Sequence, residues 1–335
     1  MANIVILGSG GWGTALAVMT AKSGHSVTLW SPFEEEIAEL SQTREHKKLL
    51  PGIILPPEIA LTTSLDMALG AELLILAVPS FAVRQTARRL RERLSDVTVI
   101  ANVAKGLEEG RLIRLSEVIE EELPSARVVA LSGPSHAEEV ARGIPTSVVS
   151  SSRHGSAAEL VQDTLMNPCF RIYTNPDIVG VELGGALKNV MALAAGVSDG
   201  LGLGDNTKAM LMTRGLSEMA RLGVAMGARR ETFAGLTGVG DLVVTCTSMH
   251  SRNRRFGIMV GEGVPPKEAL ERVGQTVEGY KATLAAHELA KRKGIEMPIT
   301  ECCHRVLYGG LSPRNGMYAL MTRPKTHEVE EHPWF

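Results

Sequence analysis

The chain has 335 residues, of which 44% are hydrophobic and 21% are charged, and its formal net charge is -2. This length exceeds the size at which a single core stops growing, so we expect two domains. The near-neutral charge gives no global attraction to nucleic acid or to an anionic membrane, and no apolar run reaches spanning length. Because the first residues also lack a basic leader with a cleavage site, we expect a cytoplasmic protein without a membrane span.

An apolar segment, residues 3–7, runs directly into the glycine-rich stretch Gly8-Ser9-Gly10-Gly11-Trp12-Gly13, and a small-residue helix is expected at 14–21. In such a G-x-G-x-x-G motif the glycines allow a tight turn, close approach of a pyrophosphate and close packing of helix on strand. The order of strand, loop and helix therefore predicts a dinucleotide site, with phosphate held at a helix N-terminus. The alternative is a glycine-rich turn that binds nothing.

Through residue 174, short β-branched runs alternate with helical stretches, which is typical of βαβ units and a parallel sheet. We expect further strands at 26–30, 72–78, 97–102, 127–132, 146–151 and 170–174, with helices at 82–94, 112–123 and 156–165. Beyond about residue 177 only helices are expected, at 178–197, 207–226, 267–272, 277–293 and 299–308. The sequence thus predicts an α/β fold: a Rossmann-like doubly wound parallel sheet in residues 1–176, followed by an all-α domain in 177–335.

Polar residues follow several of the predicted strands, at the edge where an open parallel sheet binds its ligands. Lys105 follows the strand at 97–102, and Gly133 and Ser135 follow the strand at 127–132. Ser80 lies on a third rim loop, where we expect the coenzyme rather than the substrate. The alternatives are a solvated lysine at 105 and a plain helix start after residue 132.

In the helical half, Lys188 lies in a strongly apolar stretch rich in Gly and Ala. Burial favours the neutral amine, and a nearby cation such as Lys105 would act in the same direction, so Lys188 is a candidate general base. The alternative is a lysine that extends from the helix edge to solvent.

A basic cluster, Ser251-Arg252-Asn253-Arg254-Arg255, follows in the same half. Guanidinium groups bind phosphate bidentately, and Ser and Asn add hydrogen bonds, so the cluster suits a phosphorylated ligand. A basic helix start exposed to water is the alternative. Asp241, taken without its neighbours, would be a helix cap or turn residue.

The cysteines are Cys169, Cys246, Cys302 and Cys303. They lack C-x-x-C spacing, so we expect reduced thiols rather than a zinc or redox centre, and no bound metal. Of the adjacent pair at 302 and 303, one thiol is expected to face the core and the other the surface.

Taken together, these motifs resemble those of the bacterial-type NAD(P)-dependent glycerol-3-phosphate dehydrogenases, in the same order and over essentially the whole chain. The resemblance is carried by the glycine-rich stretch, the basic cluster and five further motifs: Ala104-Lys105-Gly106, Ser132-Gly133-Pro134-Ser135, Leu187-Lys188-Asn189, Gly238-Val239-Gly240-Asp241-Leu242 and Val277-Glu278-Gly279. It implies interconversion of sn-glycerol 3-phosphate and dihydroxyacetone phosphate with NAD or NADP, and a supply of glycerol 3-phosphate for phospholipids.

The resemblance also implies roles for individual residues. Lys188 would be the proton acceptor, Lys105 would lie beside the reacting oxygen, and Asp241 would share their pocket. Substrate binding would involve Lys105, Gly133, Ser135, Lys188, Asp241, Thr245, Ser251, Arg252 and Asn253. Coenzyme binding would involve Gly8, Ser9, Gly10, Gly11, Trp12, Gly13, Lys105, Ala137, Arg252, Thr276 and Glu278. Helical second domains of this kind often support a homodimer.

The coenzyme motif departs from the general pattern at one point. An acid about 20 residues after the motif usually binds the ribose hydroxyls of NAD, or an arginine binds the 2′-phosphate of NADP. This chain has neither, because Trp30-Ser31-Pro32-Phe33 is followed by Glu34-Glu35-Glu36, which we expect to lie in a helix. The lack of an arginine, together with these glutamates, which mildly disfavour another phosphate, favours NAD while allowing NADP.

Two other functions compete with this one. A related hydroxyacid or ketopantoate-type reductase would share the Rossmann half and a lysine in the helical half, but it has less use for the basic cluster. A regulator that senses NAD(H) without turnover has no use for Lys105, Lys188 and Asp241.

Overall fold

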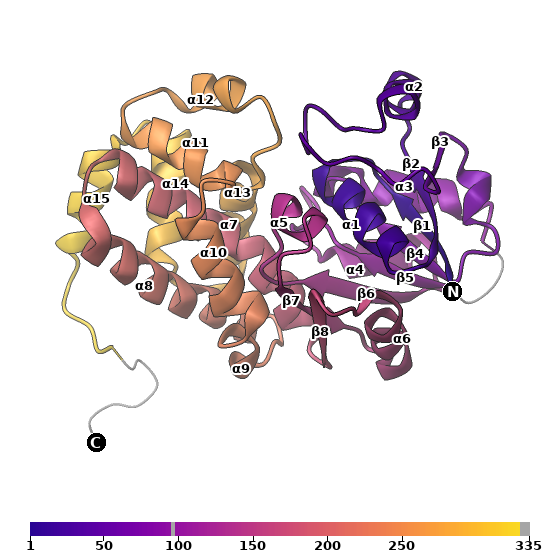
Figure 1. The fold of residues 1–335 in the computed structure, drawn as a ribbon. Helices are drawn as coiled ribbons and strands as arrows, with labels where there is room; N and C mark the ends of the chain where they lie inside the picture. Colours follow the sequence, from indigo (N-terminus) through magenta and orange to yellow (C-terminus); the bar gives the residue numbers. More distant parts are fainter. Residues whose placement is uncertain (95–97, 329–335) are drawn as a thin grey trace.

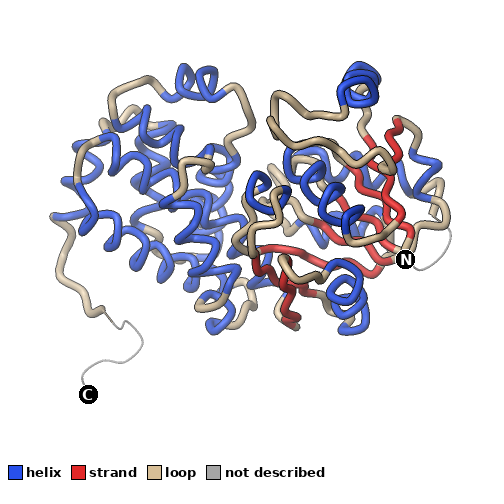
Figure 2. Tube along the Cα trace, in the orientation of Figure 1, coloured by secondary structure: helices blue, strands red, loops and turns tan. Residues whose placement is uncertain are grey.

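The computed structural model describes residues 1–94 and 98–328. Two halves lie side by side, one built on a β-sheet and one helical (Figure 1). In the part of the chain that the structure describes, the strands lie between residues 3 and 175, and the residues from 178 onward form helices and loops (Figure 2).

The sheet has eight strands in the order β3-β2-β1-β4-β5-β6-β7-β8. Their bounds are β1 Asn3–Leu7, β2 Ser26–Trp30, β3 Ala60–Thr62, β4 Leu73–Leu76, β5 Val99–Asn102, β6 Arg127–Ser132, β7 Thr146–Ser151 and β8 Phe170–Asn175. All neighbouring pairs are parallel except β6 and β7. The arrangement confirms the Rossmann-like fold predicted from the sequence.

Helices cover both faces of this sheet: α1 Gly11–Lys22, α2 Glu34–Thr43, α3 Val83–Leu90, α4 Leu115–Glu122, α5 Ala137–Ala141 and α6 Gly155–Leu165, with short 3-10 turns η1 Leu65–Ala68 and η2 Ser80–Ala82. Alternate residues of β1 point to opposite faces. Ile4 and Ile6 join a core with α1 and α6, whereas Val5 and Leu7 join a second core with α3 and α4. Burial on both faces explains why the central strands are almost continuously apolar.

The structure differs from the predicted sheet in two places. Strand β3 was missed because it has only three residues at the edge of the sheet, and the sequence pattern of so short a run is weak. The predicted parallel sheet has one exception, β7, which runs antiparallel to β6. The connection between these two strands contains the five-residue helix α5. The predicted strand start at Val97 lies outside the described residues.

The helical half contains α7 Ile178–Gly200, α8 Gly204–Ala225, α9 Arg230–Phe233, the π-helical turn η3 Leu236–Gly240, α10 Asp241–Thr247, α11 Arg252–Gly261, α12 Pro266–Val273, α13 Glu278–Lys293, α14 Pro298–Tyr308 and α15 Pro313–Met321. Helix α7 runs through the middle of this half (Figure 1) and packs against α8, α10, α11 and α13. Glycines let α7 and α11 approach closely, since a Cβ on Gly196 would lie 2.1 Å from the Arg254 carbonyl oxygen.

The expectation that no apolar segment is long enough to span a membrane is wrong for helix α7. With 23 residues it is long and apolar enough to cross a membrane by length and composition alone. Glu182 and Lys188 interrupt its apolar run, so its length is not evident from the sequence. However, 94% of its most apolar window is buried inside the protein, as in the core helix of a folded domain.

Candidate active site

The glycine-rich turn between β1 and α1 has the geometry of a phosphate-binding loop. Gly8 has a φ of +121°, and a Cβ on Gly13 would lie 1.9 Å from the Gly8 carbonyl oxygen, so both positions require glycine. A Cβ on Gly10 would instead meet no atom within 4 Å, which leaves the start of α1 open to a ligand. These residues fit the pyrophosphate of a dinucleotide.

The flanking residues of this turn are more enclosed. Ser9 is buried, and Trp12 packs against the sheet core together with Ala137, the first residue of α5. A Cβ on Gly11 would lie 2.9 Å from the Leu49 carbonyl oxygen. The predicted coenzyme residues from Gly8 to Gly13 and Ala137 therefore lie around the N-terminus of α1, where helices α1 and α5 pack together.

Two lysines meet one carboxylate where the two halves join. Lys188 Nζ lies 2.5 Å from Asp241 Oδ1, and Lys105 Nζ lies 2.7 Å from Asp241 Oδ2. Lys188 comes from the middle of α7, Asp241 is the first residue of α10, and Lys105 follows β5. The structure thus brings together three candidate residues that are 53 to 136 positions apart.

Burial decides between the alternatives left open by the sequence. Lys188 is only 6% exposed and Asp241 only 1%, so Lys188 does not extend to solvent and Asp241 is more than a turn residue. The side chain of Lys105 is 17% exposed and paired with Asp241, so it is not a solvated lysine.

The same burial sets the protonation of the cluster. Desolvation lowers the pKa of Lys188 to about 8, with Lys105 acting in the same direction and Asp241 opposing both. Burial alone would raise the pKa of Asp241, but the two ammonium groups outweigh it and hold the pKa below its usual range. The result is an ionised aspartate beside an amine that can change its protonation near neutral pH.

Three further predicted substrate residues adjoin this cluster. Lys105 Nζ donates to the Gly133 carbonyl oxygen at 2.8 Å and to Ser135 Oγ at 3.3 Å. Lys188 Nζ donates to Thr245 Oγ1 at 2.7 Å, one helical turn beyond Asp241. The Ser135 hydroxyl donates to Gly133 rather than capping α5, so the loop after β6 is not a plain helix start.

Within the basic cluster, Ser251, Asn253 and Arg254 make contacts with other described residues, whereas Arg252 and Arg255 are exposed. Ser251 caps α11 by accepting from the Arg254 backbone N–H, as in the helix-start alternative. Arg254 donates to Asp199 Oδ2 at 2.8 Å, and Asn253 donates to Asn189 and accepts from Gly279. Sequence reasoning gave no role to Asn189, although it stands beside Lys188 in one of the motifs.

Arg252, in contrast, projects from the start of α11 with its side chain exposed. Desolvation by surrounding atoms lowers its pKa, while the carboxylates of Glu278 and Glu138 oppose this. Among the described residues, no hydrogen bond or ion pair of this side chain is found, so its guanidinium is available to an anion.

Glu278 marks the other side of the coenzyme region. It begins α13, two residues after the partly buried Thr276, and its Oε2 accepts from Ser80 Oγ at 2.9 Å. Ser80 belongs to the rim loop after β4, so a predicted coenzyme residue of the helical half touches the Rossmann half where the coenzyme was expected. Burial raises the pKa of Glu278, and Ser80 opposes that shift.

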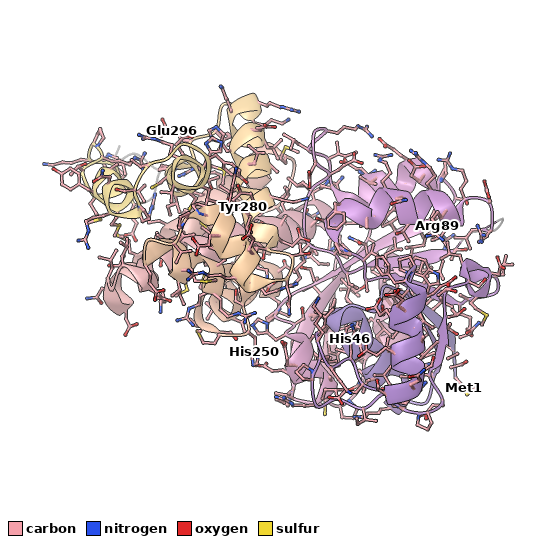
Figure 3. All side chains as sticks on the ribbon, turned by 90° about the horizontal axis from the view of Figure 1, so that it is seen from above. Met1, His46, Arg89, His250, Tyr280 and Glu296 are labelled. Atoms are coloured by element: carbon pink, nitrogen blue, oxygen red, sulfur yellow. The ribbon has the colours of Figure 1, made fainter. Side chains whose placement is uncertain are left out.

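His136 is a residue of this region that sequence reasoning missed. Its Nε2 is buried without a hydrogen-bond partner among the described residues, and its ring lies 5.7 Å from that of His250. Figure 3 shows His250 where the two halves meet. Desolvation lowers the pKa of His136, and Lys188 and Lys105 contribute to that shift, so the imidazole is neutral at neutral pH.

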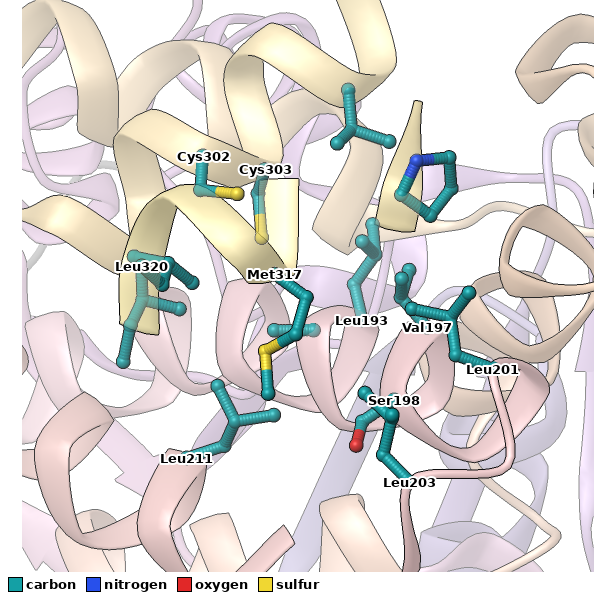
Figure 4. Close-up of a pocket in the computed structure, with 14 residues that line it drawn as sticks. Leu193, Val197, Ser198, Leu201, Leu203, Leu211, Cys302, Cys303, Met317 and Leu320 are labelled. Atoms are coloured by element: carbon teal, nitrogen blue, oxygen red, sulfur yellow. The ribbon is translucent and has the colours of Figure 1, made fainter. Parts of the chain in front are cut away.

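Of the four cysteines, Cys169 is exposed, Cys246 and Cys303 are buried, and Cys302 is half-buried. All four are free, and Cys302 and Cys303 line an apolar pocket of about 50 Å³ between α7, α14 and α15 (Figure 4). Cys303 is buried and Cys302 half-buried, which agrees with one thiol facing the core, and burial raises the pKa of both thiols. Residues 1–94 and 98–328 contain no group of three or more potential metal ligands.

Comparison with known proteins places this arrangement in a family. The family models for the N-terminus and the C-terminus of NAD-dependent glycerol-3-phosphate dehydrogenase match residues 3–158 and 177–318. The glycerol-3-phosphate dehydrogenase [NAD(P)+] of Moorella thermoacetica is 56% identical over 99% of both chains, and that of Desulfitobacterium hafniense is 54% identical over 99% of this chain and 94% of its own length.

Solved structures agree with the sequence comparison. The crystal structure of glycerol-3-phosphate dehydrogenase from Coxiella burnetii is 41% identical, with a TM-score of 0.93 over 96% of this chain and 99% of that one. The chain therefore belongs to the NAD-dependent glycerol-3-phosphate dehydrogenase family.

Proposed function

We propose that the protein interconverts sn-glycerol 3-phosphate and dihydroxyacetone phosphate with NAD or NADP as coenzyme. The observation that carries the proposal is the buried Lys188 amine, which lies 2.5 Å from Asp241 Oδ1. Burial lowers the pKa of this amine to about 8. Family membership and the phosphate-binding turn at Gly8 to Gly13 support the same activity.

Lys188 acts as the proton acceptor. A nicotinamide coenzyme would, when bound, supply the hydride acceptor for oxidation at C2 of glycerol 3-phosphate and the hydride donor for the reverse reduction. The neutral Lys188 amine takes the proton of the C2 hydroxyl, so the alcohol loses a hydride and a proton as the carbonyl forms. In reduction, the Lys188 ammonium returns the proton to the developing alkoxide.

Lys105 and Asp241 support this proton transfer. The Lys105 ammonium stabilises the negative charge that develops on the C2 oxygen. Asp241 accepts from both lysines and fixes the separation of the base and the stabilising cation. Thr245 donates back to Asp241 and accepts from Lys188, which restricts the direction in which the amine points.

The substrate phosphate binds at the start of α11. Arg252 supplies the guanidinium, since Arg254 is engaged with Asp199. Ser251 and Asn253 hold the helix start in place and present polar groups beside it, while Gly133 and Ser135 line the opposite wall next to Lys105. Binding energy from the phosphate, remote from C2, is used to orient the reacting carbon.

The residues that would hold the coenzyme extend from the glycine-rich turn to Glu278. The pyrophosphate would be held by Gly8, Ser9, Gly10, Gly11, Trp12 and Gly13, and the remainder of the coenzyme would contact Ala137, Thr276, Glu278, Lys105 and Arg252. NAD is favoured over NADP, because residues 31–43 after β2 contain no arginine and include the three glutamates at 34–36. The domain boundary falls at 176/177, between β8 and α7.

The cellular setting follows from the same proposal. The product glycerol 3-phosphate would supply phospholipid synthesis. A cytoplasmic location suits a chain in which the long apolar helix α7 is buried inside the protein. A homodimer through the helical half is part of the proposal.

An activity assay distinguishes this function from its competitors. The purified protein is given NADH with dihydroxyacetone phosphate, or with small keto acids such as ketopantoate, and coenzyme oxidation is followed. We expect turnover with dihydroxyacetone phosphate, because the exposed Arg252 can pair with its phosphate at the start of α11. Preference for a keto acid would support the ketopantoate-type reductase, and NADH binding without turnover would support the regulator.

A further inference from the structure

A carboxylate lies at the place where the sequence seemed to lack one. Glu36 is in the first turn of α2, as expected, but its side chain turns back toward the sheet. Its Oε2 accepts from Ser31 Oγ at 2.5 Å, and its Oε1 lies 3.0 Å from His46 Nε2. The nearby Ser9 hydroxyl also lowers the pKa of this carboxyl group.

These contacts fix the position of Glu36 relative to the coenzyme site. Ser31 follows directly after β2, and Ser9 lies in the glycine-rich turn after β1, the neighbouring strand of the sheet. In the dinucleotide-binding fold the adenosine ribose lies between the glycine-rich turn and the end of the second strand. Glu36 therefore bridges the two segments that flank the ribose, although it comes from the following helix.

The carboxylate is ionised and still has capacity to accept hydrogen bonds. Burial tends to raise its pKa, but hydrogen bonds from His46 and Ser31, together with the nearby Ser9 hydroxyl, outweigh this and lower the pKa to about 2. The side chain of Glu36 is 24% exposed, and each carboxylate oxygen can accept a second bond. The buried His46 holds the Glu36 carboxylate in place through its contact with Oε1. His46 is labelled in the sheet half in Figure 3.

We propose that Glu36 accepts hydrogen bonds from the 2′- and 3′-hydroxyls of the adenosine ribose and disfavours a 2′-phosphate, so that the protein selects NAD(H) over NADP(H). This inference rests on the proposed function, because it assumes a nicotinamide dinucleotide at the glycine-rich turn. Glu36 is a specific group that can distinguish a ribose hydroxyl from a 2′-phosphate. A hydroxyl gains a charge-assisted bond from the carboxylate, whereas a 2′-phosphate brings a like charge to the same oxygens.

Two neighbouring lysines could favour NADPH instead. Lys47 and Lys48 are exposed and directly follow His46, so they could supply cations to a 2′-phosphate. If they dominated, the protein would bind NADPH at least as tightly as NADH, and the affinity for NADPH would depend on these lysines rather than on Glu36.

Coenzyme affinity, measured without substrate, tests the proposal. Isothermal titration calorimetry gives Kd for NADH and NADPH with the wild type, Glu36→Gln, Glu36→Ala and the control Glu35→Gln. Glu35 is exposed and adjacent, so its substitution makes the same charge change on the same helix. Unchanged thermal midpoints establish that each variant is folded.

We expect the wild type to bind NADH more tightly than NADPH. Glu36→Gln and Glu36→Ala should each lower the ratio of the NADPH Kd to the NADH Kd by about tenfold, the order expected for one charge-assisted hydrogen bond and one like-charge contact. Glu35→Gln should leave the ratio within about twofold, as for an exposed charge. Tighter binding of NADPH by the wild type, or an unchanged ratio in both Glu36 variants, would overturn the proposal.

The two levels of inference fail separately. A ratio that shifts as expected in a protein without activity on dihydroxyacetone phosphate would leave the ribose assignment intact and remove the proposed reaction. Activity on dihydroxyacetone phosphate, combined with a ratio of NADPH Kd to NADH Kd that does not change in the Glu36 variants, would leave the proposed reaction intact and remove the ribose assignment.

Discussion

Lys188 Nζ and Asp241 Oδ1 lie 2.5 Å apart in a region where both side chains are buried. The pair joins the middle of α7 to the start of α10, and Lys105 reaches the second oxygen of the same carboxylate from the Rossmann half. One aspartate thus holds a base and a cation in register across the junction of the two halves. Removing its charge should change both the rate and the pH dependence of the reaction.

The pH dependence follows from the pKa of Lys188, which is about 8. Oxidation of glycerol 3-phosphate needs the neutral amine, so its rate should rise with pH and level off above about 8. Reduction of dihydroxyacetone phosphate needs the ammonium form, so its rate should fall above the same pH. Profiles of kcat/KM in both directions measure this, because kcat/KM reports the ionisation of the free enzyme, and parallel profiles would contradict a shared acid and base.

Asp241→Asn should shift these profiles to lower pH. The carboxylate raises the pKa of Lys188 against the effect of burial, so the amide should leave a lower pKa. We expect kcat to fall by about 10²-fold, as for the loss of a group that positions a general base. Asp205→Asn, a change on the exposed start of α8, provides the control. A profile that keeps its midpoint in Asp241→Asn would exclude the proposed coupling.

Much of the sheet could be predicted, because strands buried on both faces need continuous apolar runs. The pattern at 3–7 and 26–30 coincides with β1 and β2, and the expected helix at 178–197 corresponds to α7. Short elements were not predicted: α9 has four residues, and α10 and α11 begin in polar segments for which a helix start was only the alternative to a binding role. Their helical form depends on packing against α7, which a local pattern does not contain.

At the site, the residue types could be predicted but their partners could not. The sequence singles out Lys105, Lys188 and Asp241, yet the contact among them joins positions that only the fold brings together. The sequence predicts Glu36 only as one of three glutamates in a helix that mildly disfavour a 2′-phosphate, because a sequence does not show a side chain returning to Ser31. The engagement of Arg254 with Asp199 was likewise invisible, so the arginines seemed equivalent.

The glycine-rich turn gives a prediction about stability and binding. Gly10→Ala should fold normally, because its Cβ meets no atom within 4 Å, but the methyl group should weaken NADH binding by occupying the space next to the phosphates. Gly13→Ala should destabilise the protein, because its Cβ would lie 1.9 Å from the Gly8 carbonyl oxygen. Thermal unfolding and NADH titration measure the two effects. Equal loss of stability in both variants would contradict the distinction.

The arginines of α11 should differ in what they affect. Arg252→Ala should raise KM for dihydroxyacetone phosphate by about 10²-fold with an unchanged thermal midpoint, because a charge-assisted bond to phosphate is lost. Arg254→Ala should mainly lower the thermal midpoint, because it removes the bonds to Asp199 and to the Thr247 carbonyl oxygen. Arg255→Ala, an exposed neighbour, is the control. A normal KM in Arg252→Ala would remove it from the phosphate site.

Glu218 predicts a pH dependence of stability. Its buried carboxylate accepts from the backbone N–H groups of Ile299 and Thr300, and burial raises its pKa from 4.5 to about 7. The folded protein therefore holds a proton that the unfolded chain releases between these values, so the contribution is fully present below pH 4.5 and is lost as the pH rises through about 7.

From this shift, the free energy of unfolding should fall by up to about 3 kcal/mol between pH 5 and pH 8. In Glu218→Gln this slope should disappear, whereas the exposed control Glu262→Gln should keep it. Urea unfolding at the two pH values measures the difference. A slope that persists in Glu218→Gln would assign the pH dependence to another group.

The most direct test of the account is the effect of removing the Lys188 amine. We would measure NADH oxidation at saturating dihydroxyacetone phosphate for the wild type and Lys188→Ala, with NADH affinity from fluorescence titration. The account predicts that kcat falls by about 10³-fold, the order expected for loss of a general acid, while the NADH Kd stays within about twofold. Turnover that is unchanged in the variant would contradict the account.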